Sequence, residues 1–252
     1  MLYLVGLGLC DEKDISLKGL EILKECEKVY FEGYTNLWFG DLKKLEKLIG
    51  RRIERLKRKD LEENFEKILE EAKKKKIAIL VPGDPLIATT HSTLVLEAWK
   101  RNIETEVVHG SSVISAIAET GIHVYKIGSI VTIPLKEKVE LPASIYQKIK
   151  QNKESGLHTL CLLDLDVENQ KFLSVGKALE ILLQLEEKFK EKVISKEEEI
   201  VVGSKLGCKD SKIWFGKIEE FLNLKVELPA VILIPGKLHF MEKEFLERFK
   251  LT

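Results

Sequence analysis

The chain has 252 residues, of which 44% are hydrophobic and 33% are charged. This length and composition predict a globular protein of one or two domains, and they exclude a small disulfide scaffold or a disordered chain. The 41 basic and 41 acidic residues cancel, so the protein has no overall field that would attract a polyanion. We therefore expect no nucleic-acid partner.

The amino terminus, MLYLVGLGLCDEKD, has no basic leader and reaches acidic residues too early for a signal peptide or a membrane span. No other stretch approaches about 18 uninterrupted apolar residues. The 4 cysteines stand far apart and form no C-x-x-C pair, which favours a reducing compartment. These features predict a cytoplasmic protein without membrane association.

The first half of the chain alternates short apolar runs with amphipathic stretches, the pattern of an α/β protein with mainly parallel strands. The apolar runs predict strands at Tyr3–Leu7, Val29–Phe31, Ile53–Leu56, Ile77–Val81 and Thr105–Val108. The helical spacing of apolar residues predicts helices over Ser16–Cys26, with Ser16 as a cap, and over Asp60–Lys74.

The second half predicts strands at Ser129–Ile133, Thr159–Leu165, Glu199–Val202, Ile213–Gly216 and Ala230–Ile234, and helices at Ser144–Asn152, Val175–Phe189 and Leu238–Lys250. Only a short polar stretch joins the third and fourth of these strands, which predicts antiparallel pairing and a mixed sheet. The pattern breaks in the region 109–128. We therefore expect two domains, over residues 1–112 and 113–252.

Gly6-Leu7-Gly8 follows the first strand as a dinucleotide-binding loop would, but Asp11 stands where the third glycine belongs. A nicotinamide site is therefore unsupported. Two interpretations of the glycines remain equally open. They let a flat ligand approach the backbone closely, or they simply form a tight turn.

A sharper feature is the run Pro82-Gly83-Asp84-Pro85, directly after the strand Ile77–Val81. It places a carboxylate at the carboxyl edge of the sheet, where ligands of open α/β sheets bind, although Asp84 is equally suited to capping the next helix. The loop His109-Gly110-Ser111-Ser112 follows another strand and faces the same edge. We expect the two loops to form one pocket.

The chain lacks the motifs H-E-x-x-H, G-x-x-x-x-G-K-[ST] and G-x-S-x-G, and its 5 histidines show no metal-ligand spacing. No cysteine has an adjacent base. We therefore expect neither a metal site nor a covalent nucleophile. The lysine-rich tracts at 43–59 and 73–76 are interleaved with acidic residues, which is typical of a solvated helix face, or of a surface that steers an acidic partner.

Several segments together carry a resemblance to a known family. They are YLVGLGLCDEKDISLKGLE, EGYT, PGDPLIATTH, HGSSVISA, TGIHVYKIG, GLHTLCLLDLD and IPGKLHF. In this order, over nearly the whole chain, they resemble the diphthine synthases, a branch of the tetrapyrrole (corrin/porphyrin) methylase superfamily. PGDPLIATTH and TGIHVYK are the more specific segments.

The resemblance implies two α/β domains with mixed sheets, usually in a homodimer, with S-adenosylmethionine in the cleft between the domains. It also assigns the cofactor contacts, most of them through backbone and shape, to Leu9, Asp84, Ile87, Ser112, Val113, Leu163, Leu206 and Ala230. Two assignments depart from the family pattern. Relatives often carry histidine at the position of Ala230, and the segment around Leu206 follows its usual motif only loosely.

The implied reaction is successive N-methylation of an aminocarboxypropyl-modified histidine in translation elongation factor 2, with S-adenosylhomocysteine as the other product. The sulfonium already activates the methyl group, so the protein mainly aligns a neutral amine and excludes water. We name no catalytic base, and the number of methyl groups, three or four, stays open. The alternatives are a related methylase acting on a tetrapyrrole or RNA, and a catalytically silent module that binds the elongation factor.

Glu32 and Tyr34 suggest one hypothesis beyond the family. After the second strand, a carboxylate and an aromatic face are suited to hold the cation that grows as methyl groups accumulate. The alternative is that Tyr34 packs in the core and Glu32 is solvated.

Overall fold

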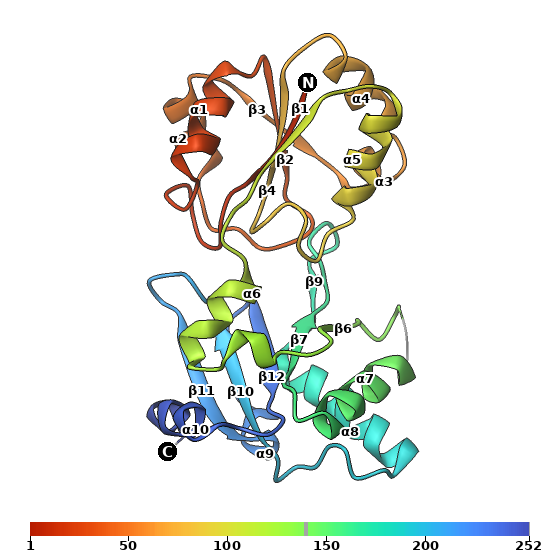
Figure 1. Cartoon of the computed structure of the whole chain (residues 1–252), viewed down its shortest axis with the longest axis vertical. Helices are drawn as coiled ribbons and strands as arrows, with labels where there is room; N and C mark the ends of the chain where they lie inside the picture. The colour runs from red at the N-terminus through yellow and green to blue at the C-terminus, as the bar shows by residue number, and fades with distance from the viewer. Residues whose placement is uncertain (139–140, 252) are drawn as a thin grey trace. The chain divides into compact units, whose positions relative to one another are not determined.

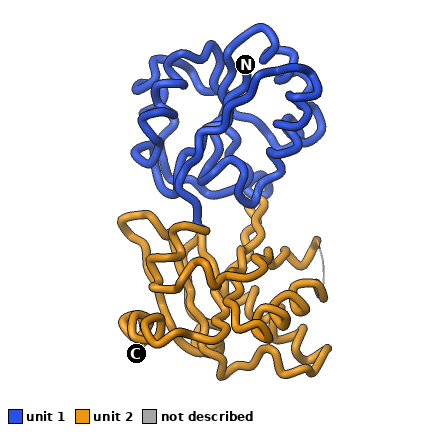
Figure 2. The backbone as a smooth tube through the Cα atoms, in the orientation of Figure 1, with its two compact units in different colours: residues 1–113, 167–169 blue, residues 114–166, 170–252 orange. Residues whose placement is uncertain are grey.

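The computed structural model describes residues 1–138 and 141–251. These residues form two compact units (Figure 2). Unit 1 comprises residues 1–113 and 167–169, and unit 2 comprises residues 114–166 and 170–252. The short segment 167–169 thus belongs to unit 1 although it lies far along the chain, an assignment that no local sequence pattern signals.

Unit 1 is a five-stranded parallel sheet with helices on both faces (Figure 1). Its strands are β1 (Leu2–Gly6), β2 (Lys28–Glu32), β3 (Ile53–Leu56), β4 (Ile77–Val81) and β5 (Thr105–Val108). Its helices are α1 (Leu17–Glu25), α2 (Leu42–Ile49), α3 (Arg58–Glu62), α4 (Glu66–Ala72) and α5 (His91–Lys100). The predicted parallel strands are confirmed, three of them with the same bounds.

Alternation along the strands builds the two apolar layers of unit 1. Leu2 and Leu4 face a cluster with residues of α4 and α5, whereas Tyr3 and Val5 face a cluster with residues of α1 and α2. The sheet order is β3-β2-β4-β1-β5. From β1 the chain builds β2, β3 and β4 on one side of that strand and then places β5 on its other side. The loops after β4, β1 and β5 are therefore neighbours at the carboxyl edge, where such sheets bind ligands.

The predicted helix over Asp60–Lys74 is wrong in its extent, because the structure divides it into α3 and α4. The backbone N–H groups of Glu63 and Asn64 both donate to the Lys59 carbonyl, at 3.1 and 2.9 Å, which closes the first helix. The apolar spacing continues across this break, so periodicity alone did not reveal it.

Unit 2 has one mixed five-stranded sheet in the order β11-β10-β12-β7-β6 and a two-stranded ribbon, β8-β9. Its strands are β6 (Val131–Ile133), β7 (Thr159–Leu163), β8 (Leu165–Asp166), β9 (Lys171–Phe172), β10 (Glu199–Ser204), β11 (Lys212–Lys217) and β12 (Ala230–Ile234). Its longer helices are α7 (Ala143–Glu154), α8 (Val175–Phe189) and α10 (Phe240–Leu246). The short elements are α6 (Val113–Ala116), η1 (Ile117–Thr120), η2 (Val124–Lys126), α9 (Ile218–Phe221) and η3 (Glu247–Phe249).

The antiparallel pairing of β10 with β11 is confirmed. The mixed sheet is confirmed too, since β6 and β7 pair in parallel whereas the pairs β10–β11, β10–β12 and β12–β7 are antiparallel. The predicted strand Thr159–Leu165 is interrupted at Asp164. That carboxylate accepts hydrogen bonds from the backbone N–H groups of Leu135 and Leu165, at 3.1 and 2.9 Å. The helix predicted over Leu238–Lys250 is also shorter, because α10 gives way to the 3₁₀ turn η3.

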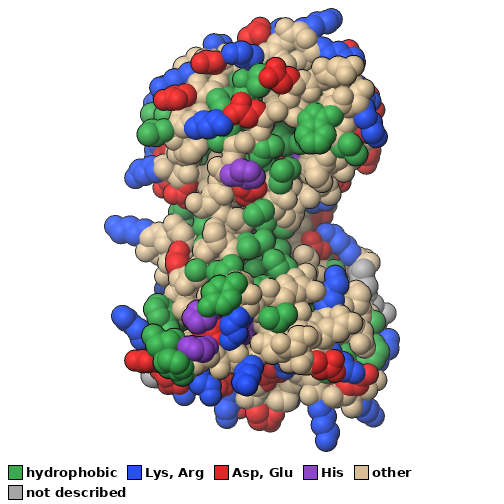
Figure 3. Space-filling view, viewed as in Figure 1, with side chains coloured by type: hydrophobic (Ala, Val, Ile, Leu, Met, Phe, Trp, Pro, Cys, Tyr) green, Lys and Arg blue, Asp and Glu red, His purple; other side chains and the backbone are tan. Residues whose placement is uncertain are grey.

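The viewed surface carries positive and negative side chains interspersed, in keeping with the zero formal charge (Figure 3). Within residues 1–138 and 141–251, no helix has the length and apolar character needed to cross a bilayer.

Candidate functional site

Three loops of unit 1 meet through their glycines at the carboxyl edge of the sheet. Gly8 and Gly83 exchange backbone hydrogen bonds of 3.2 and 2.7 Å. A Cβ atom on Gly6 would lie 2.6 Å from the Gly110 nitrogen and 2.7 Å from the Gly83 oxygen, distances that real side chains essentially never show. The loops after β1, β4 and β5 therefore touch backbone to backbone. Gly6 must be a glycine for this contact, a role that neither interpretation drawn from the sequence anticipated. Gly8 has a φ of +74°, as the tight-turn interpretation allows.

Asp84 joins two of these loops. Its Oδ1 accepts from the Leu86 N–H at 3.0 Å, and its Oδ2 accepts from the Gly110 N–H at 3.3 Å and from His109 Nδ1 at 2.7 Å. The residue is buried, with 5% of its surface exposed. The helix-cap alternative for Asp84 is wrong, because the residue at the N-cap of α5 is Thr90. The expected neighbourhood of the PGDP and HGSS loops is thus observed.

The other predicted site residues of unit 1 lie on the same loops. Leu9 follows β1 and is half-buried, Ile87 follows Asp84 in the loop after β4, and Ser112 is buried after β5. Val113 begins α6. The sheet order therefore brings these residues to one edge from three separate parts of the chain.

The three predicted site residues of unit 2 gather at one edge of its own sheet. Leu163 ends β7, and Ala230 begins the antiparallel neighbour β12. Ser204, at the end of β10, pairs with Ala230, and the buried Leu206 follows that strand. Antiparallel pairing thus collects residues that lie far apart in the sequence.

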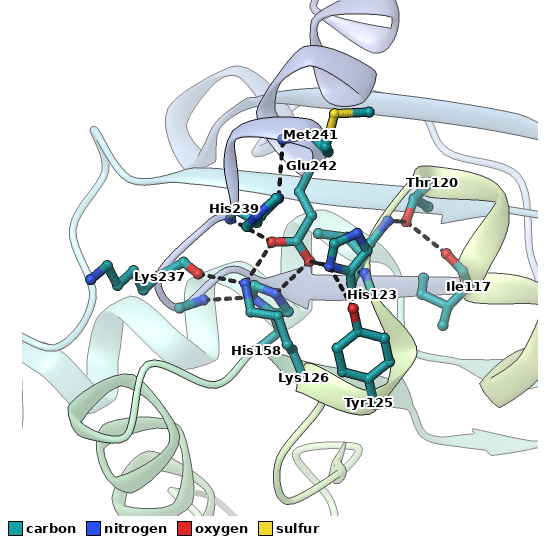
Figure 4. Close-up of polar contacts among 12 residues, drawn as sticks. Ile117, Thr120, His123, Tyr125, Lys126, His158, Lys237, His239, Met241 and Glu242 are labelled. Carbon is teal, nitrogen blue, oxygen red and sulfur yellow. Dashed lines mark hydrogen bonds and ion pairs between the residues drawn. The ribbon is translucent and has the colours of Figure 1, made fainter.

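A second polar centre in unit 2 surrounds Glu242, and sequence reasoning gave it no role (Figure 4). The Oε1 atom of this fully buried carboxylate accepts from the His123 N–H at 2.9 Å and from His158 Nε2 at 3.1 Å. Oε2 accepts from Lys126 Nζ at 2.6 Å and from the His239 N–H at 2.7 Å. Burial raises the pKa of Glu242, but these donors outweigh it and hold the pKa at about 2.

His158 is neutral and fully satisfied within this centre. Burial lowers its pKa, its Nε2–H donates to Glu242, and its Nδ1 accepts from the Gly236 N–H at 2.9 Å. Through its hydrogen bonds, Glu242 thereby links three segments that carry the family resemblance, TGIHVYK, GLHT and IPGKLHF. In the sequence, the histidines of these motifs were the one feature that could have pointed to this polar centre. They do not stand at the spacing of metal ligands. Within the described part of the chain, no group of such residues is suited to hold a metal ion.

Glu32 and Tyr34 do not form an open site, so the hypothesis that they hold a growing cation is wrong. Glu32 is fully buried and Tyr34 is 3% exposed. The Arg58 guanidinium already lies 5.1 Å from the centre of the Tyr34 ring. The alternative is right for Tyr34, which packs in the core, but not for Glu32, which is buried rather than solvated.

Comparison with known proteins identifies the class to which this fold belongs. The family model for the tetrapyrrole (corrin/porphyrin) methylases matches residues 1–222. The chain belongs to this family.

Its relatives narrow the assignment. The chain is 43% identical over 251 residues to a diphthine synthase of Methanocaldococcus jannaschii, and 40% identical over 249 residues to one of Methanococcus maripaludis, with 98% of each chain covered in both cases. A crystal structure of diphthine synthase superposes with a TM-score of 0.88 at 35% identity, covering 99% of this chain and 95% of the other. The protein is therefore an S-adenosylmethionine-dependent methyltransferase.

The loops of unit 1 fit such a cofactor. They offer closely packed backbone groups, apolar side chains such as Leu9 and Ile87, and one buried carboxylate, the mixture that binding sites for small molecules require. Each oxygen of an ionised carboxylate can accept more than one hydrogen bond, so Asp84 can hold its loops and still accept from a ligand.

Proposed function

We propose that this methyltransferase transfers methyl groups successively to the amine of an aminocarboxypropyl-modified histidine in translation elongation factor 2, as a homodimer. The relatives named diphthine synthase, aligned over nearly the whole chain, support this substrate. The observation that carries the proposal is the convergence of the loops after β1, β4 and β5, held by Asp84 at the ligand-binding edge of the sheet.

The reaction demands little chemistry from the protein. The cofactor supplies a sulfonium-activated methyl group, and an α-amino group with a pKa near ~8 is partly neutral at pH 7. The protein's contribution is to hold the amine in line with the methyl group and to exclude water. No residue is assigned as a general base.

We propose that the cofactor contacts Leu9, Asp84, Ile87, Ser112 and Val113 of unit 1 and Leu163, Leu206 and Ala230 of unit 2. In unit 1, Asp84 is the charged member of this set, so it is suited to accept hydrogen bonds from hydroxyl or amino groups of the ligand. Replacement of Asp84 by Ala should weaken S-adenosylhomocysteine binding, measured by calorimetry, by roughly tenfold or more, because both a ligand contact and the junction of two loops are lost.

The test is mass spectrometry of elongation factor 2 bearing the unmethylated intermediate, after incubation with the protein and S-adenosylmethionine. A gain of three methyl groups identifies a trimethylating enzyme, and a gain of four identifies one that also forms a methyl ester. No gain by a protein that binds the cofactor would contradict the proposal and direct the search to tetrapyrrole and RNA acceptors.

A further inference from the structure

Glu32 and His91 form a buried pair in unit 1 to which the proposed reaction assigns no role. Glu32 ends β2 and is fully buried, and His91 begins α5 with 1% of its surface exposed. Glu32 Oε2 and His91 Nε2 face each other at 3.6 Å. Within the described residues, this nitrogen has no hydrogen-bond partner. A buried polar atom without a partner is costly and calls for an explanation.

The hydrogen positions around His91 follow from its partners. Its Nδ1 lies 3.0 Å from the carbonyl oxygen of Pro85, which can only accept, so Nδ1 carries a hydrogen. In the neutral ring, Nε2 then presents a lone pair to Glu32. An ionised Glu32 would place two acceptors opposite each other, whereas one shared proton allows a hydrogen bond between them. The geometry therefore favours a single proton in this pair.

The burial of Glu32 also favours that proton, against the effect of its hydrogen bonds. Its carboxylate accepts from the N–H groups of Tyr34 and Thr35, at 2.9 and 2.8 Å, and from the Thr35 hydroxyl at 2.9 Å; these neutral donors lower its pKa, but burial outweighs them. Burial raises the pKa of Glu32 to about 7, and burial lowers the pKa of His91.

The charged groups around the pair come from α3 and from the segment 167–169. They are Arg58, stacked on Tyr34, together with Glu62, which lies 3.4 Å from Arg58, and Glu168, which accepts from the Arg58 N–H. Burial also raises the pKa of Tyr34, so its hydroxyl stays neutral. One cation and two anions in this shell do not neutralise an additional carboxylate.

The pair connects directly to the loop that carries Asp84. The Pro85 carbonyl accepts from His91 and, at 2.6 Å, from the Thr89 hydroxyl, and Pro85 is the residue next to Asp84. We propose that Glu32 and His91 are positioning residues for this loop: one proton held between them keeps His91 against Pro85 and thereby sets the affinity for the cofactor. This inference rests on the proposed cofactor role of the loop.

The test is calorimetric titration of the intact protein with S-adenosylhomocysteine between about pH 6 and pH 8.5, a range that spans the titration of a group near pH 7. The affinity of the unchanged protein should fall by about threefold to tenfold as the pair loses its proton, since tenfold corresponds to only about 1.4 kcal/mol. Glu32→Gln should keep the low-pH affinity throughout, because its amide can donate to Nε2 at every pH. His91→Phe should bind about tenfold more weakly at low pH, with no pH profile.

Glu63→Gln is the matched control, because it removes an exposed carboxylate at the end of α3, outside the charged groups named above, and its pH profile should equal that of the unchanged protein. Parallel profiles for Glu32→Gln and the unchanged protein would overturn the inference. In that case, weaker cofactor binding by Asp84→Ala would still support the proposed cofactor site. Absence of binding by the unchanged protein at every pH would overturn both.

The unchanged protein also allows a test that does not depend on the variants folding. Nitrogen-15 NMR of the histidine rings should show His91 as the Nδ1–H tautomer, with its Nε2 resonance changing as the pair titrates. The Nε2–H tautomer for His91 would overturn the inference.

Discussion

Each unit buries a glutamate beside a histidine, but the two pairs differ in charge. In unit 2, Glu242 stays ionised, with a pKa of about 2, whereas the pKa of Glu32 in unit 1 is raised to about 7. Both side chains are shielded from solvent, but Glu32 lies deeper in the protein, so burial raises its pKa further. The donors add to the difference: Glu242 receives four hydrogen bonds, one of them from the Lys126 ammonium, and Glu32 receives three from neutral groups.

The difference in charge suits two structural roles, a fixed junction in unit 2 and a pair in unit 1 whose protonation can change. The Glu242 centre joins three segments of unit 2 with every partner of the carboxylate and of His158 satisfied, so it is expected to be rigid. Within the described residues, the Glu32–His91 pair leaves one nitrogen without a partner, next to the loop that carries Asp84. Its state can change with a single proton. The variants below test this contrast, from the largest expected effect to the smallest.

Glu242→Gln should destabilise the protein by about 3–5 kcal/mol, the usual cost of breaking a buried ion pair. Whichever way the amide is turned, its NH₂ group faces two donors, either Lys126 and His239 or His123 and His158. Urea unfolding at neutral pH measures the loss, and exposed Glu244→Gln on the same helix is the control. A loss of unfolding free energy below about 1 kcal/mol would contradict the interpretation of the Glu242 centre as a rigid junction.

The pH dependence of this loss has a definite sign. Because the pKa of Glu242 is lowered from 4.5 to about 2, its stabilisation is present above pH 4.5 and disappears as the pH falls through about 2. The unchanged protein and Glu242→Gln should therefore converge in stability in acid.

Gly6→Ala should cost about 2–3 kcal/mol, because the new methyl group meets backbone atoms that cannot move aside. It should also abolish measurable S-adenosylhomocysteine binding by forcing the loops after β1, β4 and β5 apart. Thermal unfolding and calorimetry measure the two effects, with exposed Ser111→Ala as the matched change in the same loop cluster. Normal binding by Gly6→Ala would show that the site tolerates looser loops.

Glu32→Gln should change stability in the direction opposite to Glu242→Gln. With its oxygen at the Oε1 position, the amide keeps the bonds from the Tyr34 and Thr35 N–H groups. Its NH₂ group then directs one hydrogen toward His91 and the other toward the Thr35 hydroxyl, which must turn from donating to accepting. At about pH 8 we expect a gain of about 1–2 kcal/mol, because an ionised buried carboxylate is no longer required. If Glu32→Gln were less stable than the unchanged protein at this pH, Glu32 and Glu242 would not differ in charge as described above.

The pH window follows from the raised pKa. The stabilisation that the neutral Glu32 side chain provides is complete below pH 4.5 and is lost as the pH rises through about 7. The advantage of Glu32→Gln should therefore be small near pH 4.5 and grow up to about pH 8, as measured by urea unfolding across the range. Glu63→Gln, treated in the same way, should show no such trend.

His109→Ala should have the smallest effect, a loss below about 1 kcal/mol. Its side chain is 72% exposed, so its 2.7 Å contact with Asp84 is screened by solvent. The half-buried Gly110 N–H remains to hold the carboxylate. A larger loss would show that His109, rather than the backbone, holds the PGDP loop to the loop after β5.

Local patterns predicted the regular elements well where apolar spacing and capping agree. The helix Val175–Phe189 is confirmed with its bounds, and Ser16 caps α1 by accepting from the Gly19 N–H. Predictions failed where a side chain ends an element against its own periodicity, as Asp164 does between β7 and β8. Hydrogen bonds of this kind depend on which backbone groups the fold brings near.

The sequence by itself determined the α/β class, the parallel first sheet, the mixed second sheet and the family, because these depend on periodicity and on ordered motifs. It also marked Asp84 as a residue of the proposed cofactor site. Only the tertiary structure decided that Gly6 must be glycine for loop packing, and that Glu32 and Glu242 differ in charge. The physical reason is that the pKa of a buried carboxylate depends on its depth and on its donors, and both are set by the fold: the donors of Glu242 come from segments more than a hundred residues apart in the chain.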